Sequence, residues 1–490
     1  MITQVLNRQF VLEQLEQVKA HLQKLAKAKG ETGRRRAEEL PEGAEDLTSD
    51  DYQNALEFVN KSLKQEGRHS SGQVGFEQPE GERRRGKGSA LMDDLSFFSR
   101  DPVISNLQSA LEEYYETQLP DMLDRVTPET QGRRRGGSSL PPAAQRSIKG
   151  CGGRRGDQGR RLFDQFSTTD PGWICSAVSM GIRWFHGKHK FIEKPATPKP
   201  ISDQARIIMV GDWGSGIPRA QKVAAEMRKV LDEGKAQGRQ QLVIHLADVY
   251  YSGWKPEVQK HFLKHWPVRI EEADEITSWA VNGNHEMYSG GHAYFDTLLG
   301  DPRFKGHKNS DGEYSSLFSL LNGKWRILGI DSAWEDHDLV SPQPQWIRNQ
   351  IREAEQAGQK VMLLCHHQLF SAFEPGGEKM VKALGDLLES PKIHSWFWGH
   401  EHRCAIYKPY MNIPYARLVG HGGVPVYQWK KQSDPVAEPA LFEYRGRFKE
   451  GLEQWALFGF AVLDFDGPNI KVQYINEDGE KHYEEMITAA

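Results

Sequence analysis

The chain has 490 residues, of which 38% are hydrophobic and 27% are charged, and its formal net charge is −4. This length exceeds that of one ordinary domain, and the small net charge argues against a partner chosen by charge, such as nucleic acid or a membrane surface. The four cysteines are widely spaced and form no C-x-x-C pair, which argues against a disulfide framework or a zinc ribbon.

No export or membrane segment is evident in the sequence. The N-terminus lacks the basic start, apolar core and small-residue cleavage site of a secretory signal. The apolar stretch over residues 172–185 is broken by Arg183, short of the roughly 20 residues that span a bilayer. We therefore expect a cytoplasmic protein without a transmembrane segment.

Residues 1–200 are predicted to form a helical, partly disordered region. Arginine triplets at 34–36, 83–85 and 133–135 stand among Gly, Ser, Pro and Glu, a composition typical of disordered linkers. Their acidic neighbours and the lack of an aromatic platform favour solvated linker charge, so no nucleic acid is expected. Three helices are predicted between the linkers, and the region offers surfaces for an unidentified protein partner. The apolar stripes are Val11, Leu15, Val18, Leu22 and Leu25 in the first helix, and Ile104, Leu107, Leu111 and Tyr114 in the third; the second begins at a cap-like sequence, residues 48–51.

From residue 201 to 480 the pattern predicts an α/β domain. Short apolar runs indicate strands near 206–212, 241–248, 279–285, 325–331, 360–367, 395–402 and 415–423. One helix is predicted from Pro218 to a stop at Gly234, and another over 343–357, before Gly358. Asp466 and Gly467 indicate a closing hairpin. Strands that are apolar on both faces and separated by helices indicate central sheets covered by helices.

Most of these strands end in a side chain that can bind a metal. The carboxyl ends of strands are where ligands gather in layered α/β proteins. Taken singly, each residue has a structural alternative: Asp212 would cap the following helix, and Asn284 would suit a turn. Taken together, they predict a shared metal site. The residues are Asp212, Asp248, Asn284 with His285, His366, and His400 with His402.

The chemistry of this set points to phosphate esters. Carboxylate, carboxamide and imidazole groups form a mixed oxygen and nitrogen set that favours Fe, Mn or Zn over Ca²⁺ or thiolate-bound metals. There are more ligands than one tetrahedral ion needs, so two ions sharing a carboxylate fit better. Paired ions of this kind clamp the attacking and leaving oxygens of an in-line displacement at phosphorus.

Five sequence blocks carry a resemblance to a known family. They are "DWG" at 212–214, "ADVYY" at 247–251, "GNHE" at 283–286, "LLCHH" at 363–367 and "GHEH" at 399–402. In this order they resemble the calcineurin-like metallophosphoesterases, and among these the small purple acid phosphatases. Gly214 and Tyr251 are similar to the purple type, whereas the phosphodiesterase branch has D-x-H and lacks the tyrosine.

The resemblance implies a four-layer α/β/β/α sandwich and a phosphomonoesterase in which a metal-bound hydroxide attacks phosphorus in line. A phosphodiesterase or nucleotidase with the same metals, or a non-catalytic scaffold, are the alternatives. The expected substrate is a phosphorylated small molecule or protein. The expected cofactors are ferric iron with divalent Fe, Mn or Zn, or two divalent ions.

The resemblance also implies a role for each residue. Asp212, Tyr251 and His402 would hold the first metal, Asn284, His366 and His400 the second, and Asp248 would bridge both. His285 would contact the phosphate and help to protonate the leaving alkoxide, and His292 would bind substrate at the rim. His421 is expected at the rim or behind the ligands, and His245 is expected to be a packed strand residue.

Overall fold

The computed structural model describes residues 8–31, 49–70, 97–123, 187–450 and 453–489. The chain forms two compact units, residues 1–187 and 188–490. The boundary therefore lies before the predicted one at residue 200. Residues just before 200 join the second unit because β1 (Lys199–Pro200) pairs in parallel with β5 (Phe318–Leu321), and the Ala196 N–H donates to the Leu317 carbonyl at 2.8 Å.

The first unit contains three described long helices, α1 (Arg8–Glu31), α2 (Ser49–Ser70) and α4 (Pro102–Leu123). The predicted apolar stripe of α1 is buried at Val11, Leu15, Val18 and Leu22. Asp101 caps the N-terminus of α4, because its carboxylate accepts from the N–H groups of Val103 and Ile104 at 2.9 and 3.1 Å. The arginine triplets lie outside the described residues, and the protein partner predicted for this region stays a prediction. Among the described helices, none has the length and apolarity needed to cross a membrane.

Two sheets form the centre of the second unit. The six-stranded sheet has the order β16-β15-β14-β2-β3-β4, and the eight-stranded sheet has the order β1-β5-β6-β7-β8-β10-β9-β11. In the first sheet the strands are β2 (Ala205–Val210), β3 (Gln240–His245), β4 (Ile276–Ala280), β14 (Gly459–Asp466), β15 (Asn469–Asn476) and β16 (Lys481–Thr488). In the second they include β6 (Trp325–Gly329), β7 (Lys360–Leu364), β8 (Ser395–Trp398), β9 (Cys404–Tyr407), β10 (Tyr415–Val419) and β11 (Ala440–Glu443). A separate pair is formed by β12 (Arg447–Glu450) and β13 (Glu453–Ala456).

A strand overlaps each of the seven predicted runs, but the third run, 279–285, is only partly correct: β4 ends at Ala280, and Asn284 and His285 open α9. The hairpin is confirmed, where Asp466 pairs with Asn469 across Gly467. The domain extends past the predicted end at 480, because β16 pairs with β15 along its length. Short helical turns complete it. They are α8 (Lys255–Glu257), η7 (Val258–Leu263), η8 (Ile270–Glu272), α9 (Asn284–Met287), η9 (Tyr294–Leu298), η10 (Pro302–His307) and η11 (Gly385–Leu387).

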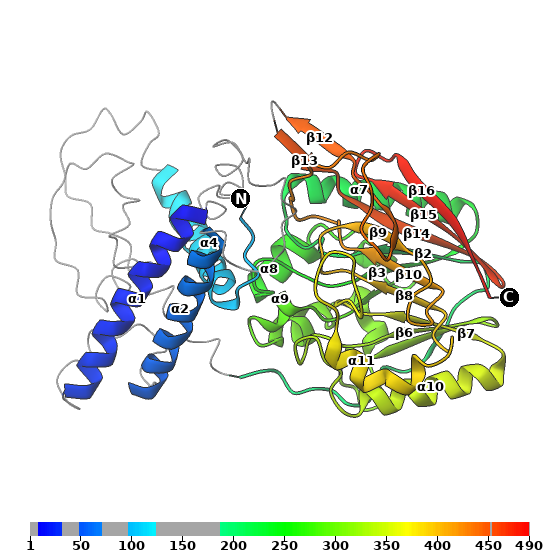
Figure 1. Ribbon diagram of the computed structural model, residues 1–490, viewed down its shortest axis with the longest axis horizontal. Coiled ribbons are helices and arrows are strands. Elements are labelled where there is room, and N and C mark those ends of the chain that lie inside the picture. The colour runs from blue at the N-terminus through cyan, green and yellow to red at the C-terminus, as the bar shows by residue number, and fades with distance from the viewer. Residues whose placement is uncertain (1–7, 32–48, 71–96, 124–186, 451–452, 490) are drawn as a thin grey trace. The chain divides into compact units, whose positions relative to one another are not determined.

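The layers follow the predicted α/β/β/α arrangement (Figure 1). Side chains from both sheets, such as Ile207, Ile244, Ile327 and Phe397, share one buried core between them. Helix α7 (Pro218–Ala236) packs on β3 and β14 of the six-stranded sheet. Helices α10 (Gln343–Ala357) and α11 (Glu378–Leu384) bury their apolar faces against the other sheet.

One predicted helix end is wrong. Helix α7 begins at Pro218 as expected but continues beyond Gly234, which is buried within it. A Cβ at Gly234 would lie 2.3 Å from the amide of Gln241, so this glycine serves close packing and not helix termination. The left-handed residue after the helix is Gly238, with φ of 69°. Helix α10 does end at Gly358, with φ of 64°.

A buried ion pair joins the two sheets. Arg417 on β10 is 3% exposed and donates two hydrogen bonds to Glu485 on β16, at 2.6 and 2.5 Å. Removing one partner of such a pair leaves an uncompensated charge in the interior.

We expect Arg417→Met to lower the free energy of unfolding by about 3–5 kcal/mol in denaturant titrations. The double variant Arg417→Met/Glu485→Met should recover most of this loss, because neither charge remains. The exposed pair Lys408 and Glu438 is the control, and Lys408→Met should change stability by less than about 1 kcal/mol. Equal effects at the two sites would contradict the prediction.

Candidate metal centre

The strands of both sheets deliver the predicted ligands to one place. Asp212 follows β2, Asp248 follows β3 and Asn284 opens α9 after β4 in the six-stranded sheet. His366 follows β7, and His400 and His402 follow β8, in the eight-stranded sheet. The alternative role for Asp212 as a helix cap is wrong, because the N-cap residue of α7 is Ile217.

Two groups of potential ligands overlap at one residue. Asp212, Asp248 and His402 form one group, and Asp248, His366 and His400 form the other. Within each group the ligand atoms lie within 4.8 Å of one another, and all five residues are buried. Asp248, to which the resemblance gives the bridging role, is the member they share.

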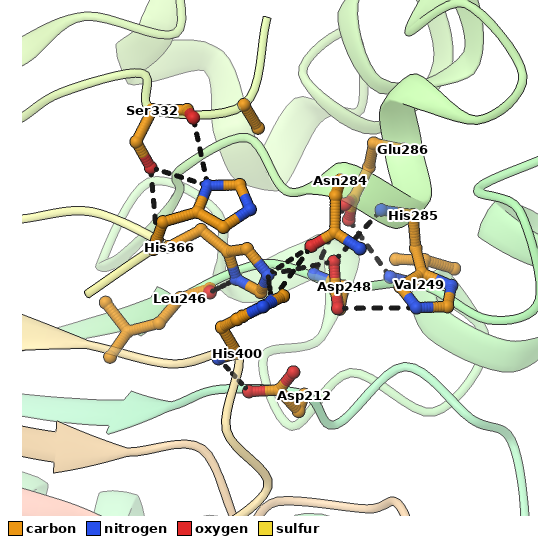
Figure 2. A network of polar contacts seen from close by, with 12 residues as sticks. Asp212, Leu246, Asp248, Val249, Asn284, His285, Glu286, Ser332, His366 and His400 are labelled. Atoms are coloured by element: carbon orange, nitrogen blue, oxygen red, sulfur yellow. Dashed lines mark hydrogen bonds and ion pairs between the residues drawn. The ribbon is translucent and has the colours of Figure 1, made fainter. Parts of the chain in front are cut away.

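His366 lies at the middle of the second group (Figure 2). Its Nε2 atom is 2.9 Å from Asn284 Oδ1, 3.2 Å from Asp248 Oδ1 and 3.2 Å from His400 Nδ1. Its Nδ1 atom is 2.8 Å from the carbonyl oxygen of Leu246 and donates to it. That hydrogen bond fixes the ring and turns the Nε2 lone pair towards the centre, as is usual for a metal-binding histidine. The neighbouring His367 directs its Nδ1 atom to Ser332 instead.

A tyrosine that the sequence reasoning missed joins the first group. The hydroxyl group of Tyr250 lies 3.0 Å from Asp212 Oδ1, 3.2 Å from Asp248 Oδ2 and 2.9 Å from His402 Nε2. The predicted residue was Tyr251, whose carbonyl oxygen accepts from His285 Nδ1 at 2.6 Å. The motif spacing points to Tyr251 as the metal ligand. The only sign in the sequence that Tyr250 could take this role is that the two tyrosines are adjacent.

The two other predicted histidines lie in different surroundings. His285 is buried, its backbone N–H donates to Asp248 Oδ1 at 3.2 Å, and its Nε2 atom is 3.8 Å from Asp248 Oδ2. His292 is exposed, and its ring lies edge-on to that of His189 at 5.6 Å. It belongs to none of the ligand groups found among the described residues.

The backbone around the ligands is strained. Asp212, Ala247, Asp248, His400 and His402 have φ values of 55°, 74°, 71°, 71° and 51°. Side chains with a Cβ rarely occupy this left-handed region, at a cost of about 1–2 kcal/mol each, and such residues concentrate at functional sites. The neighbouring glycines make room: a Cβ at Gly283 would lie 2.4 Å from Asp248 Oδ1, and one at Gly399 would lie 2.8 Å from Asp212 Oδ2.

Glu286 supports the strained loop that carries Asp248. Its carboxylate accepts from the N–H groups of Asp248 and Val249 at 3.3 and 3.0 Å. Burial and the negative charge of Asp248 raise the pKa of Glu286 to about 8. Glu286 lies within the "GNHE" block, but the motif alone does not show which backbone groups its carboxylate contacts, so this supporting role is not predictable from the sequence.

The electrostatics of the cluster suit a cation. Burial by itself would raise the pKa of Asp248, but the charges of His366 and His285 hold it well below its usual value. Burial likewise opposes a charge on His366, yet Asp248 and Asp212 raise the pKa of His366 to about 9. Positive charge is therefore favoured between the two buried carboxylates. Their oxygens, the Asn284 amide and the imidazoles are the donor types that Fe, Mn and Zn accept, so the residues fit such ions.

Comparison with known families agrees with this geometry. Residues 205–404 match the sequence model of the family described as calcineurin-like phosphoesterase. This part of the chain is a calcineurin-like phosphoesterase domain. By family it is a metallophosphoesterase, a hydrolase of phosphoric esters. A search of curated protein sequences finds no match.

Solved structures with a related fold are distant from the phosphoesterase domain. The GAP50 anchor of the inner membrane complex of Plasmodium is 12% identical over 58% of this chain and 89% of that chain, with a TM-score of 0.42. A dimetal phosphatase from Danio rerio is 12% identical over 58% of this chain and 99% of that chain, with a TM-score of 0.38. Vps29 from Chaetomium thermophilum is 15% identical over 59% of this chain and all of that chain, with a TM-score of 0.24. At these scores the likenesses add nothing to the family match.

We expect Asp248→Asn to weaken metal binding at both ligand groups, because it removes the charge that they share. The loss of Mn²⁺ affinity in calorimetric titration should be at least about 10–100-fold, the effect known for residues that only support a ligand. Asp274→Asn is the control, since Asp274 is exposed at the surface and belongs to none of the ligand groups found among the described residues. Unchanged affinity in the Asp248 variant would contradict a shared ligand.

Proposed function

We propose that the phosphoesterase domain hydrolyses phosphate monoesters with a pair of metal ions. The overlap of two buried ligand groups at Asp248 is the observation that carries the proposal. Asp212, Tyr250 and His402 would hold one ion, and Asn284, His366 and His400 the other. When bound, two such ions supply a water of lowered pKa as nucleophile and positive charge for the phosphate oxygens.

The metals in this proposal are ferric iron with divalent Fe, Mn or Zn, or two divalent ions. Tyr250 replaces Tyr251 in the ligand set because its hydroxyl group contacts both carboxylates. Asn284 presents its oxygen to the centre, since its Nδ2 group donates to the hydroxyl of Tyr288 at 2.7 Å. Asn284 and His366 are thus each oriented by a contact outside the centre.

His285 is the proposed general acid. Its Nδ1–H donates to the Tyr251 carbonyl, which fixes the ring, and its Nε2 atom lies 3.8 Å from Asp248 Oδ2, on the side of the metal ligands. A proton on Nε2 is then available for the leaving alkoxide, a transfer that typically contributes about 10²–10⁴-fold to a rate. The substrate contact predicted for His292 stays a prediction.

A phosphodiesterase or nucleotidase built on the same ligands is the rival proposal, and the substrate decides between them. We expect kcat/KM for p-nitrophenyl phosphate to exceed that for bis-p-nitrophenyl phosphate and for cyclic nucleotides by about tenfold or more, a difference of about 1.4 kcal/mol at the transition state. Asp248→Asn should reduce every activity by at least about 100-fold, as loss of electrostatic stabilisation commonly does, while the exposed-site control Asp274→Asn should not. A preference for the diester would overturn the monoesterase proposal but keep the hydrolase.

The two tyrosines provide a second test. Iron-loaded protein should show a visible absorption band from a ferric tyrosinate, and Tyr250→Phe should abolish it. Tyr251→Phe, the matched control, should keep the band, because the Tyr250 hydroxyl is the one that contacts Asp212, Asp248 and His402. Loss of the band in the Tyr251 variant alone would return the ligand role to Tyr251. A colourless protein that is active with manganese would reject iron and keep the hydrolase.

A further inference from the structure

We propose that Cys404, His421 and His482 form a separate site for one Zn²⁺-like ion, which joins the two sheets. One ligand atom from each residue lies within 4.8 Å of the others. Cys404 is the first residue of β9, and His421 follows β10, both in the eight-stranded sheet. His482 lies on β16 of the six-stranded sheet, so an ion held by all three would bridge the sheets.

The imidazole nitrogens of this cluster have no other partners within the described part of the chain. His421 is 4% exposed, and neither of its ring nitrogens nor either nitrogen of His482 makes a hydrogen bond there. An unsatisfied buried polar group costs about 1–3 kcal/mol. The equally buried His307 shows the usual arrangement, since its Nδ1 contacts the Ser315 carbonyl at 2.8 Å and its Nε2 accepts from the Ala280 N–H at 3.0 Å.

Unpartnered nitrogens alone would not define a metal site. His245 also has two of them, but its ring packs among Trp213, Phe262 and Trp266 and belongs to none of the ligand groups found among the described residues. His421 and His482 differ because a thiol and a second imidazole converge with each of them.

The backbone and an aromatic stack hold the three ligands in place. Cys404 pairs with Val419 in the antiparallel ladder, and the Gly420 N–H donates to the Arg403 carbonyl at 2.8 Å, which fixes His421 beside β9. The ring of His482 stacks on that of Tyr444, with centroids 3.5 Å apart. A Cβ at Gly459 would lie 2.6 Å from His421 Nε2, so only glycine leaves room for this ring.

A thiolate with two imidazoles is a donor set that suits Zn²⁺, which binds Cys sulfur and His nitrogen at about 2.0–2.3 Å. Burial lowers the pKa of His421 to about 3 and that of His482 to about 2, so both rings are in the neutral form that binds metals. Burial and the charges of Glu485 and Glu443 raise the pKa of the Cys404 thiol, so the ion must displace the thiol proton, which passes to solvent on binding. The proposed dinuclear centre contains oxygen and nitrogen ligands only, so a thiolate signal distinguishes the two sites.

Cobalt substitution of the full chain tests the proposal. Co²⁺-loaded protein should show a thiolate-to-cobalt charge-transfer band in the near ultraviolet. Cys404→Ser and His482→Gln should each abolish the band and remove one equivalent of bound cobalt. Cys365→Ser is the matched control: this thiol is also buried and free, but it accepts a hydrogen bond from Trp396 Nε1, and its loss should leave the band unchanged. A missing band in the wild-type protein, or a band that survives Cys404→Ser, would overturn the site.

The proposal stands independently of the dinuclear centre. In the Asp248→Asn background the cobalt band should persist even where phosphatase activity is lost. Saturating Zn²⁺ should raise the melting temperature of that variant by about 5 °C or more, and adding His482→Gln should abolish the shift. Should Cys404→Ser fail to fold, the half-buried His482 provides the decisive variant. Equal Zn²⁺ shifts with and without His482→Gln would refute a joining ion.

Discussion

Two carboxylates buried in the same cluster, those of Asp212 and Asp248, are the constraint on which the phosphoesterase domain depends. Both are almost fully buried, and the hydroxyl group of Tyr250 contacts them both. Charges of like sign in an interior repel and lose hydration, so they persist only where positive charge compensates them. Without bound metal, the compensating positive charge is the protonated ring of His366, because the two carboxylates raise its pKa to about 9. Asp212 and Asp248 also have positive φ values, so bringing their carboxylates together costs backbone strain in addition to charge repulsion.

The sandwich follows from this constraint. The six-stranded sheet contributes the two carboxylates and Asn284, whereas the eight-stranded sheet contributes the three histidines. Neither sheet alone can assemble a ligand group, because each of the two groups draws from both. The core between the sheets therefore stabilises the fold and also sets the separation of the ligands. The buried ion pair of Arg417 and Glu485 also joins the two sheets and so helps to keep them aligned.

The sequence predicts most of this domain because its signals are local. Strands that are apolar on both faces, such as β2 and β7, need no tertiary information, and each is followed by a polar side chain, Asp212 or His366, that marks the carboxyl edge. What the sequence could not predict depends on contacts between distant residues. The sequence pattern predicts a helix end at Gly234, but this glycine lies within α7 and leaves space for the side chain of Gln241. The choice between Tyr250 and Tyr251 depends on how the backbone turns after Asp248, and spacing does not encode that.

The cluster of Cys404, His421 and His482 could not be predicted from the sequence either, because it depends on contacts between distant residues. Its three ligands share no motif and come from two different sheets, and one of them, His482, lies beyond the predicted end of the domain at 480. One segment nonetheless serves both centres, since His400 and His402 face the carboxylates while Cys404 faces His421. Gly420 lies between the centres: a Cβ there would come within 2.9 Å of Asp212 Oδ2, and the next residue is His421. An ion at Cys404 would therefore hold the segment that carries two of the proposed catalytic ligands. Its thiolate suits softer metals than the carboxylates do, so the two centres can select different ions.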